Sequence, residues 1–298
     1  MNKASELAIL ECPMCGVSNC LTTVTRLGEY RVNLCSVCHG ETVHPIPNAD
    51  TLNSAYQDFD AGRLARENLD KYAKLAARLL TNALDRSNAN PRSGSRKRSF
   101  LDYGCGGGHF LRAAQTLGFH SVGMEFDPVS VTAARALGLD VRRGALPEEP
   151  EALRGERFDV VLSFHVLEHV PAPFRTLAAL SDCTLPGGVI FLGVPDQQSL
   201  PSRIKKGLRY IGIRSKDWGY IQPPVHLHGF AIETFTAIAE RLDLSLQYAF
   251  RVSPLDPEAF PATRNYWEHL PFQRLVYQLA RMAASPGYLF AAFQKPNR

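Results

Sequence analysis

Cysteines in the N-terminal part of the chain form two pairs with the same internal spacing. Cys12 and Cys15 make the first C-x-x-C pair, and Cys35 and Cys38 make the second. Each pair turns tightly and presents two thiolates to one ion, and two pairs at this separation are typical of a tetrahedral Cys₄ site for Zn²⁺. The spacing therefore predicts a structural zinc ribbon over residues 1–48. Alternative ligands in this segment, at poorer spacing, are Cys20, His39 and His44.

The stretch FLDYGCGGGHFL, residues 100–111, places an acid just before closely spaced glycines. A strand that ends in such a turn and continues as a helix brings backbone close to a nucleotide-like ligand, because glycine lacks a Cβ and tolerates positive φ. The helix N-terminus then offers N–H groups to an anionic group. The acid is Asp102 and the glycines are Gly104, Gly106 and Gly108. A dinucleotide fingerprint would need a glycine at position 109, which is His109.

A second acid, Glu125, stands where the next strand should end. A carboxylate at that place can accept hydrogen bonds from both hydroxyls of a ribose. The two acids and the glycines together indicate a nucleoside-containing ligand other than a dinucleotide.

The bulk composition fits one large domain with an appendage. The chain has 298 residues, 45% of them hydrophobic, and a net charge of +4, which permits an anionic partner without demanding one. No apolar run approaches the roughly 20 residues of a membrane-spanning helix, and the N-terminus is too weakly apolar for a signal peptide. We therefore expect no transmembrane segment and a cytoplasmic location. The seven cysteines should be thiols or metal ligands rather than disulfides.

Short apolar strands alternate with helices from Phe100 onward, which argues for an α/β domain with a doubly wound parallel sheet. The expected strands are 99–103, 121–125, 158–164 and 189–194, with further strands at 244–250 and 288–295. The expected helices are 108–117, 128–137, 172–183 and 231–242. The regions before this domain are a zinc ribbon over 1–48 and a helical connector with a basic linker over 49–99; the domain itself spans 100–298.

Four segments in this order resemble the class I S-adenosylmethionine-dependent methyltransferases: LDYGCGGG, VGMEFDP, FDVVLSFHVLEHVPAP and LPGGVIFLGVP. The resemblance covers roughly residues 50–250. It implies a seven-stranded Rossmann-like sheet, preceded here by the small zinc ribbon, and S-adenosylmethionine as cofactor. By this resemblance, Asp102 and the turn from Gly104 to Gly108 hold the methionine part of the cofactor. Glu125 would hold the ribose and Phe126 would lie against the adenine.

The resemblance places further residues near the cofactor. Ala145 and Leu146 would border the adenine. The family often has an acid where Ala145 stands, so a contact from this chain would use the backbone. Ser163 and Phe164, at the end of the strand expected at 158–164, would lie near the methyl group, together with His165.

Histidines form the constellation with catalytic potential. His165, Glu168 and His169 fall at positions i, i+3 and i+4, and His226 and His228 precede a later helix. Methyl transfer to a hydroxyl needs an aligned nucleophile and removal of its proton, and imidazole with its ordinary pKa of about 6.5 suits that removal. We expect His169, with His165, His226 or His228 as partners, to act as base or to position the substrate.

Two other interpretations of this cluster stay open. Glu-His in a VLEHV segment is widespread in the fold, where it caps and packs the loop. Small-RNA 3′-end 2′-O-methyltransferases and certain quinone-biosynthesis O-methyltransferases carry E-x-x-E-H here. Because His165 replaces the first glutamate, a metal bound here would be a transition metal rather than Mg²⁺.

An insert near 196–228 follows the strand expected at 189–194. Its stretch 200–220 carries six basic residues and one acid, with apolar residues at helical spacing. We expect a lid whose cations suit a phosphate-bearing substrate, such as a nucleotide-linked sugar, a carrier-protein phosphopantetheine or a lipid-linked glycan. A helix packed on the core and a peripheral membrane contact are the alternatives.

The residues favour an enzyme that methylates a hydroxyl of a small molecule or saccharide in a biosynthetic pathway. The ribbon, followed by a P-x-P sequence, is similar to those of bacterial sugar and natural-product methyltransferases. One alternative is an RNA methyltransferase, although Arg26 and Arg31 are few cations for gripping phosphates. The others are a sugar C-methyltransferase and a cofactor-binding regulatory protein without catalysis.

Overall fold

The computed structural model describes residues 11–56, 61–87, 97–213, 216–252 and 287–297, with 276, 278–280, 282–283 and 285. Most of the expected basic linker, at 88–96, lies outside the described residues, as do residues 214–215 of the expected lid. Helices α1 (Ala49–Tyr56) and α2 (Ala61–Arg86) occupy the expected helical connector.

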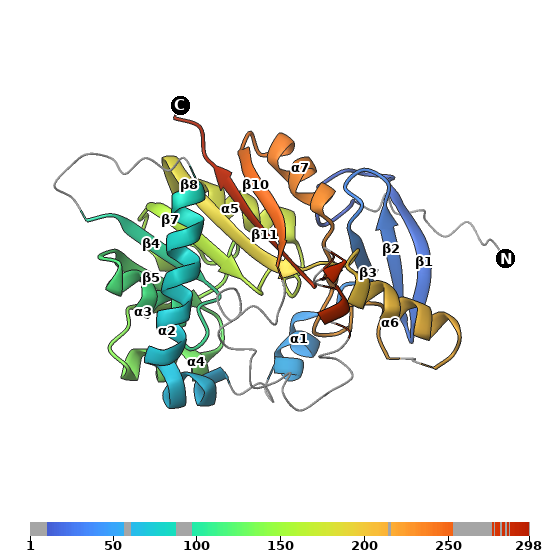
Figure 1. Ribbon diagram of the computed structural model, residues 1–298, viewed down its shortest axis with the longest axis horizontal. Helices are drawn as coiled ribbons and strands as arrows, with labels where there is room; N and C mark the ends of the chain where they lie inside the picture. The colour runs from blue at the N-terminus through green and yellow to red at the C-terminus, as the bar shows by residue number, and fades with distance from the viewer. Residues whose placement is uncertain are drawn as a thin grey trace.

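A seven-stranded, mostly parallel sheet forms the centre of the larger part of the molecule (Figure 1). Strands β6, β5, β4, β7 and β8 are parallel neighbours, whereas β11 lies antiparallel between β8 and β10. This arrangement confirms the predicted doubly wound, Rossmann-like fold. In spatial order the strands are β10 (Ser245–Val252), β11 (Tyr288–Gln294), β8 (Thr184–Pro195), β7 (Phe158–Phe164), β4 (Ser99–Tyr103), β5 (His120–Glu125) and β6 (Val141–Arg143).

Successive residues of the central strands alternate between two hydrophobic cores, as the two-residue period of a strand requires. Leu101 and Val161 belong to one core, and Phe100 and Val160 belong to the other. The strands are apolar on both faces because helices cover both sides of the sheet. This explains why the sequence showed continuous apolar runs rather than an alternation of apolar and polar residues.

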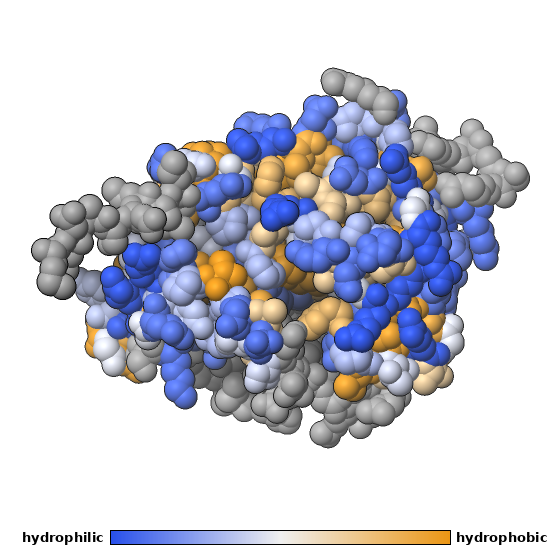
Figure 2. All heavy atoms as spheres, turned by 180° about the vertical axis from the view of Figure 1, so that it is seen from behind, coloured by the Kyte–Doolittle hydropathy of each residue, from blue (hydrophilic) through white to orange (hydrophobic). Residues whose placement is uncertain are grey.

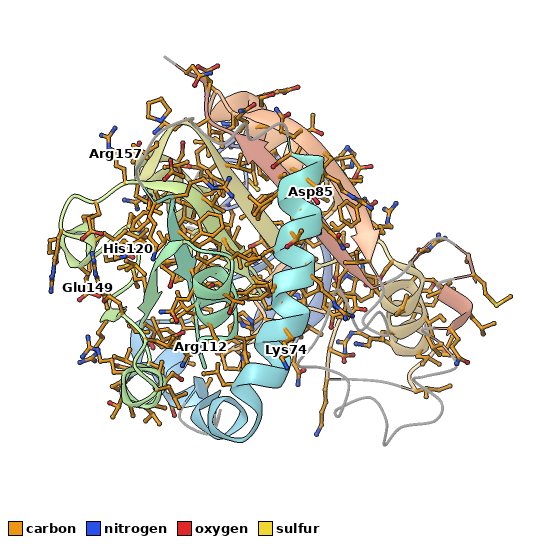
Figure 3. All side chains as sticks on the ribbon, turned by 60° about the vertical axis from the view of Figure 1, so that its left-hand side comes forward. Lys74, Asp85, Arg112, His120, Glu149 and Arg157 are labelled. Carbon is orange, nitrogen blue, oxygen red and sulfur yellow. The ribbon has the colours of Figure 1, made fainter. Side chains whose placement is uncertain are left out.

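Helices α2 and α3 (His109–Thr116) close one of these cores, and α5 (Pro173–Asp182) and α7 (Ile232–Arg241) close the other. Figure 3 shows α2 lying across its face of the sheet, with Lys74 and Asp85 along its exposed side. Helix α4 (Pro128–Ala136) begins at Asp127, whose carboxylate accepts hydrogen bonds from the first N–H groups of the helix.

The N-terminal cysteine segment folds as a small antiparallel sheet beside α7 (Figure 1). Its strands are β1 (Leu21–Leu27), β2 (Tyr30–Cys35) and β3 (Glu41–His44). The fourth strand, β9 (His228–Gly229), comes from the α/β domain, and Thr42 pairs with His228. The sheet of the predicted ribbon is therefore completed by a segment of the predicted domain.

Helix α6 (Leu200–Tyr210) lies in the insert, and the short 3₁₀ helix η1 (Pro150–Leu153) precedes β7. The Oγ atom of Ser199 caps α6 by accepting a hydrogen bond from Ser202. None of the described helices combines the length and hydrophobicity that a membrane span requires. On the face opposite to that of Figure 1, hydrophilic residues alternate with smaller apolar groups (Figure 2).

Candidate active site

The candidate site lies where the strand order of the sheet reverses. The chain runs from β4 outward to β5 and β6, and then returns to place β7 on the other side of β4. Asp102 pairs with Gly123 of β5 and with Leu162 of β7, so the ends of all three strands meet at one edge. Open α/β sheets bind ligands at such a reversal, outside the carboxyl ends of the strands.

The glycine-rich turn after β4 serves two different purposes. Gly104 has φ +74°, and a Cβ there would collide with Val166, so packing and backbone conformation both require glycine. Gly106 has φ +47°, but a Cβ there would meet no atom within 4 Å. At Gly108, where α3 begins, a Cβ would collide with Leu139. Only Gly106 of the three therefore borders open space, as the backbone of a ligand cradle should.

Two carboxylates flank this turn. The Glu125 carboxylate accepts hydrogen bonds from the N–H groups of Gly106, Phe126 and Asp127, at 2.9, 2.9 and 3.0 Å, which fix its orientation. Asp102 is only 2% exposed, and its Oδ2 atom has no hydrogen-bond partner among the described residues. Burial, with a smaller contribution from the charge of Glu125, raises the pKa of Asp102 to about 8. A buried, unpartnered carboxylate oxygen is suited to a cationic or hydrogen-bonding ligand group.

The residues expected around the adenine are Phe126, which follows β5, and Ala145 and Leu146, which follow β6. Phe126, directly after Glu125, is 41% exposed. The N–H of Leu146 donates to the Tyr103 hydroxyl at 3.1 Å, and the N–H of Ala145 donates to Glu149 at 3.1 Å. The segment bearing Ala145 and Leu146 is thus held by side chains of neighbouring elements.

The last residues of β7 and the first residue after it form the opposite wall. Ser163 is fully buried, and its Oγ has no hydrogen-bond partner among the described residues. The Phe164 ring packs against Phe110 and His165, with ring centroids 5.2 and 4.8 Å apart. His165 has φ 58°, a left-handed conformation that is uncommon outside glycine and clusters at functional sites.

The structure brings His165, Glu168, His169 and His226 together. The Nδ1–H of His165 donates to Glu168 Oε1 at 3.0 Å, and His169 Nε2 lies 3.8 Å from the same oxygen. Glu168 is 1% exposed, and its Oε2 has no hydrogen-bond partner among the described residues. The rings of His169 and His226 meet edge to face, with centroids 4.5 Å apart. Glu168 is therefore the buried carboxylate of an imidazole cluster.

Backbone carbonyl groups fix the tautomers of two of these imidazoles. His169 Nδ1 lies 3.0 Å from the carbonyl oxygen of Val225, and His226 Nδ1 lies 2.9 Å from that of Tyr220. A carbonyl oxygen can only accept, so each Nδ1 carries the proton and each Nε2 carries the lone pair. Each ring thus presents Nε2 as its proton acceptor.

The protonation states follow from burial. Burial lowers the pKa of His169 to about 4, although the charge of Glu168 opposes the shift. Burial by itself would raise the pKa of Glu168, but the His165 hydrogen bond and the neighbouring imidazoles outweigh it and lower that pKa to about 2. At neutral pH the cluster therefore consists of an ionised Glu168 beside a neutral His169.

His228 occupies a different place from the other predicted histidines. It is 1% exposed, with Nδ1 2.9 Å from Thr42 Oγ1 and Nε2 2.9 Å from the carbonyl oxygen of Val170. Both ring nitrogens are therefore engaged within the protein. Residue spacing near a helix could not distinguish His228 from His226, because the partner Thr42 lies 186 positions away in the sequence.

The predicted cysteine pairs converge, and a fifth thiol joins them. The Sγ atoms of Cys12 and Cys38 lie 3.9 Å apart, and those of Cys15 and Cys35 lie 3.8 Å apart. Cys20 places its Sγ 3.4 Å from that of Cys35. One ligand atom from each of Cys12, Cys15, Cys20 and Cys35 lies within 4.8 Å of the others. Cys20 stands in this group where the prediction had Cys38. Buried thiols at these separations are donors that fit Zn²⁺.

Several cations of the insert are engaged within the protein. Lys206 forms an ion pair with Glu41 of β3 at 2.8 Å. Lys205 lies over the Tyr220 ring, 4.5 Å from its centroid, and Arg209 donates to the backbone carbonyl oxygen of Arg26. Helix α6 is thus attached to the ribbon sheet through its basic side chains.

A family model described as a methyltransferase domain matches residues 62–249, more than half of the chain. The chain belongs to this methyltransferase family. It is a class I S-adenosylmethionine-dependent methyltransferase domain, and S-adenosylmethionine is the cofactor of such enzymes. The glycine turn, Asp102 and Glu125 offer the open backbone and the buried carboxylates that this cofactor needs.

This methyltransferase is similar to curated relatives over part of its length. It is 38% identical over 97 residues to a ubiquinone biosynthesis O-methyltransferase of Hahella chejuensis, which covers 30% of this chain and 40% of that protein. It is also 38% identical over 94 residues to a protein of the same name from Cereibacter sphaeroides, covering 30% and 38%. The matches thus span less than half the length of these relatives.

A solved structure shares the fold. A chain from the complex between the Haloferax volcanii Trm112 methyltransferase activator and a methyltransferase superposes with a TM-score of 0.53 at 17% identity. The superposition covers 84% of this chain and 97% of that one.

Proposed function

We propose that this methyltransferase transfers a methyl group to a hydroxyl oxygen of a small molecule. The observation that carries the proposal is the hydrogen bond from His169 Nδ1 to the Val225 carbonyl, which leaves Nε2 as a proton acceptor beside the strand ends. The names of the curated relatives, ubiquinone biosynthesis O-methyltransferases, support an oxygen acceptor. A pathway that builds small molecules is the setting that fits these relatives.

S-adenosylmethionine, when bound, supplies an electrophilic methyl group on a positively charged sulfur. Glu125, held by three backbone N–H groups, would accept the ribose hydroxyls with its remaining lone pairs. The Asp102 carboxylate would accept from the methionine part, and exposed Phe126 would cover the adenine. Gly106 leaves the space that the methionine part needs.

His169 would accept the proton that the acceptor hydroxyl loses. A hydroxyl oxygen becomes strongly acidic as it forms a bond to carbon, so even an imidazole whose pKa lies near 4 can take this proton. The imidazolium that results would be stabilised by Glu168, whose Oε1 lies 3.8 Å from His169 Nε2. His165 would hold Glu168 in place through its 3.0 Å hydrogen bond.

His226 would orient the acceptor hydroxyl beside His169. Its Nδ1 also carries the proton, so its Nε2 can accept a hydrogen bond from that hydroxyl. His228 takes no part in proton transfer in this proposal, since both of its nitrogens are engaged by Thr42 and Val170. The predicted set of catalytic histidines is thereby narrowed to His165, His169 and His226.

We also infer that the N-terminal cysteines bind one structural Zn²⁺. Support comes from the convergence of thiols from two C-x-x-C turns and from their complete burial. Metal ligation would fix the two turns relative to each other in a segment too small for a large core of its own.

A direct test measures methyl transfer with isotopically labelled S-adenosylmethionine against a panel of phenolic, saccharide and phosphorylated hydroxyl acceptors, with RNA as a further member. The proposal predicts label in a hydroxyl-bearing small molecule, at the oxygen, by mass spectrometry. Label found only in RNA, with binding that weakens steeply with salt, would favour the RNA alternative instead. Label on carbon would favour the sugar C-methyltransferase alternative.

A further inference from the structure

The loop that carries Glu168 and His169 is connected to the ribbon through the segment 225–228. The N–H of Leu227 donates to the carbonyl oxygen of Glu168 at 2.8 Å, while the carbonyl oxygen of Leu227 accepts from Val43 of β3 at 3.0 Å. The carbonyl of Val225 holds His169. Leu227 therefore forms one backbone hydrogen bond to the histidine loop and another to the ribbon.

The side chain of His228 reinforces this connection. Its Nε2 must carry a proton, because the group it faces is the carbonyl oxygen of Val170, 2.9 Å away. Its Nδ1 is then an acceptor, so the hydroxyl of Thr42 donates to it at 2.9 Å. A single buried imidazole thus bridges β3 of the ribbon to the end of the histidine loop.

The cysteine turns themselves are attached to the α/β domain. The N–H of Phe174, at the start of α5, donates to the carbonyl oxygen of Pro13 between Cys12 and Cys15 at 2.9 Å. The Thr234 hydroxyl, at the start of α7, donates to the carbonyl oxygen of Cys38 at 2.9 Å. Both cysteine turns are therefore anchored to the α/β domain by hydrogen bonds.

We propose that His228 is a positioning residue: by bridging Thr42 and Val170 it sets the geometry of His169 and His226, so that the ribbon maintains the catalytic cluster. This inference rests on the proposed function, because it assigns the histidines their task. The ribbon then does more than stabilise the fold. Through Thr42 and β3, it helps to hold the loop that carries His169, the proposed proton acceptor.

The test uses the full chain with its metal bound, labelled with ¹⁵N, and detects the long-range ¹⁵N–¹H couplings of each imidazole, which report its tautomer. In the wild type, His169 and His226 should show the Nδ1–H pattern. His228→Ala should convert His169 to a mixture of tautomers, and Thr42→Val should do so in part. His228→Gln should restore the wild-type pattern, because its amide can still donate to Val170.

The matched control is Thr184→Val, which removes a fully buried hydroxyl bonded to the Leu180 carbonyl at 2.7 Å, at the start of β8. This variant should lose thermal stability without altering the histidine signals. Unchanged His169 and His226 patterns in both His228→Ala and Thr42→Val, with stability losses like that of the control, would overturn the inference. If His228→Ala does not fold, Thr42→Val decides it, and unchanged His169 and His226 patterns in that variant would overturn the inference.

Calorimetry with S-adenosylmethionine separates this inference from the function itself. Affinity for the cofactor should stay within about twofold in Thr42→Val and His228→Gln, because neither residue contacts the glycine turn. If the wild type does not bind S-adenosylmethionine, the proposed function is contradicted. The inference about His228 is tested only by the His169 and His226 signals.

Discussion

The imidazole of His169 donates its Nδ1–H to the carbonyl oxygen of Val225, 56 positions away in the sequence and 3.0 Å away in space. This bond selects the tautomer whose Nε2 can accept a proton, and it ties the histidine loop to the segment before β9. The proposed chemistry therefore depends on a contact between two parts of the chain that no local pattern connects.

Replacement of His169 by Gln should slow turnover strongly while leaving cofactor affinity intact. Loss of a general base lowers the rate by about 10²–10⁴-fold, whereas the glycine turn and Glu125 are untouched. Turnover and calorimetric affinity should be compared with those of His120→Gln, an exposed histidine at the start of β5 (Figure 3). Full activity in His169→Gln would show that the residue only packs.

Binding of S-adenosylmethionine at pH 7 should release up to about one proton from Asp102. Burial raises the pKa of this carboxyl to about 8, so it is largely protonated before binding, and the positive charges of the ligand favour its ionised form. The binding enthalpy should therefore vary with the ionisation enthalpy of the buffer. This dependence should vanish in Asp102→Asn. A wild-type enthalpy that is the same in every buffer would contradict the prediction.

Gly106→Ala should reduce cofactor affinity far more than Gly118→Ala. Both glycines have positive φ, +47° and +83°, and a Cβ at either would meet no atom within 4 Å. Both variants should thus lose stability to a similar extent, by about 1–2 kcal/mol, in thermal unfolding. Of these two glycines, Gly106 is the one proposed to line the cofactor site, so calorimetry should show weakened binding for that variant alone. Equal affinities would remove Gly106 from the cofactor site.

The stability of the protein should fall as the pH drops from about 6.5 toward 4, in part through His228. Burial lowers the pKa of this imidazole to about 4, so between these pH values the unfolded chain binds a proton that the folded chain does not. The stabilisation is present above pH 6.5 and is lost as the pH falls. By pH 5, this histidine should have lowered the free energy of unfolding by about 2 kcal/mol. Urea unfolding of the wild type and of His228→Gln at several pH values measures this loss as the difference in acid dependence between the two proteins. The same slope in both proteins would refute it.

Cys20→Ser should retain the metal, whereas Cys35→Ser should lose it. Cys20 donates its S–H to the Val17 carbonyl oxygen at 3.0 Å, as a thiol outside the ligand set would. Cys35 accepts hydrogen bonds from the N–H groups of Val37 and Cys38, as a thiolate ligand does. The zinc content of each purified variant checks this. A metal-free Cys20→Ser would make Cys20 a ligand.

Local patterns were sufficient for the sheet but not for the connections around it. Residues 99–103 and 158–164 form β4 and β7 with the bounds predicted from their apolar runs, because strands buried on both faces leave a clear signal. Strand β6 escaped prediction because it has only three residues, two of them arginine. The two residues of β9 acquire their conformation from pairing with β3, which composition cannot indicate.

The candidate site was predictable to the same degree. Asp102, Gly106 and Glu125 belong to one strand–turn–helix pattern and its neighbouring strand, so their proximity followed from the sheet topology. The convergence of His169 with His226 and the engagement of His228 by Thr42 depend on long-range packing. Cys20 joined the thiol cluster although its spacing from the two cysteine pairs gave little sign of it.

The pairing of β3 with β9 also limits which ribbons could replace this one when genes recombine. A module that completes its own sheet can be exchanged between genes with little regard for its new neighbour. Here the last strand, β9, belongs to the α/β domain. A ribbon from another protein would therefore need an edge strand that pairs with β9 and a hydroxyl that can bond to His228. Chimeras joined near residue 48 should therefore tolerate only donors that carry both features.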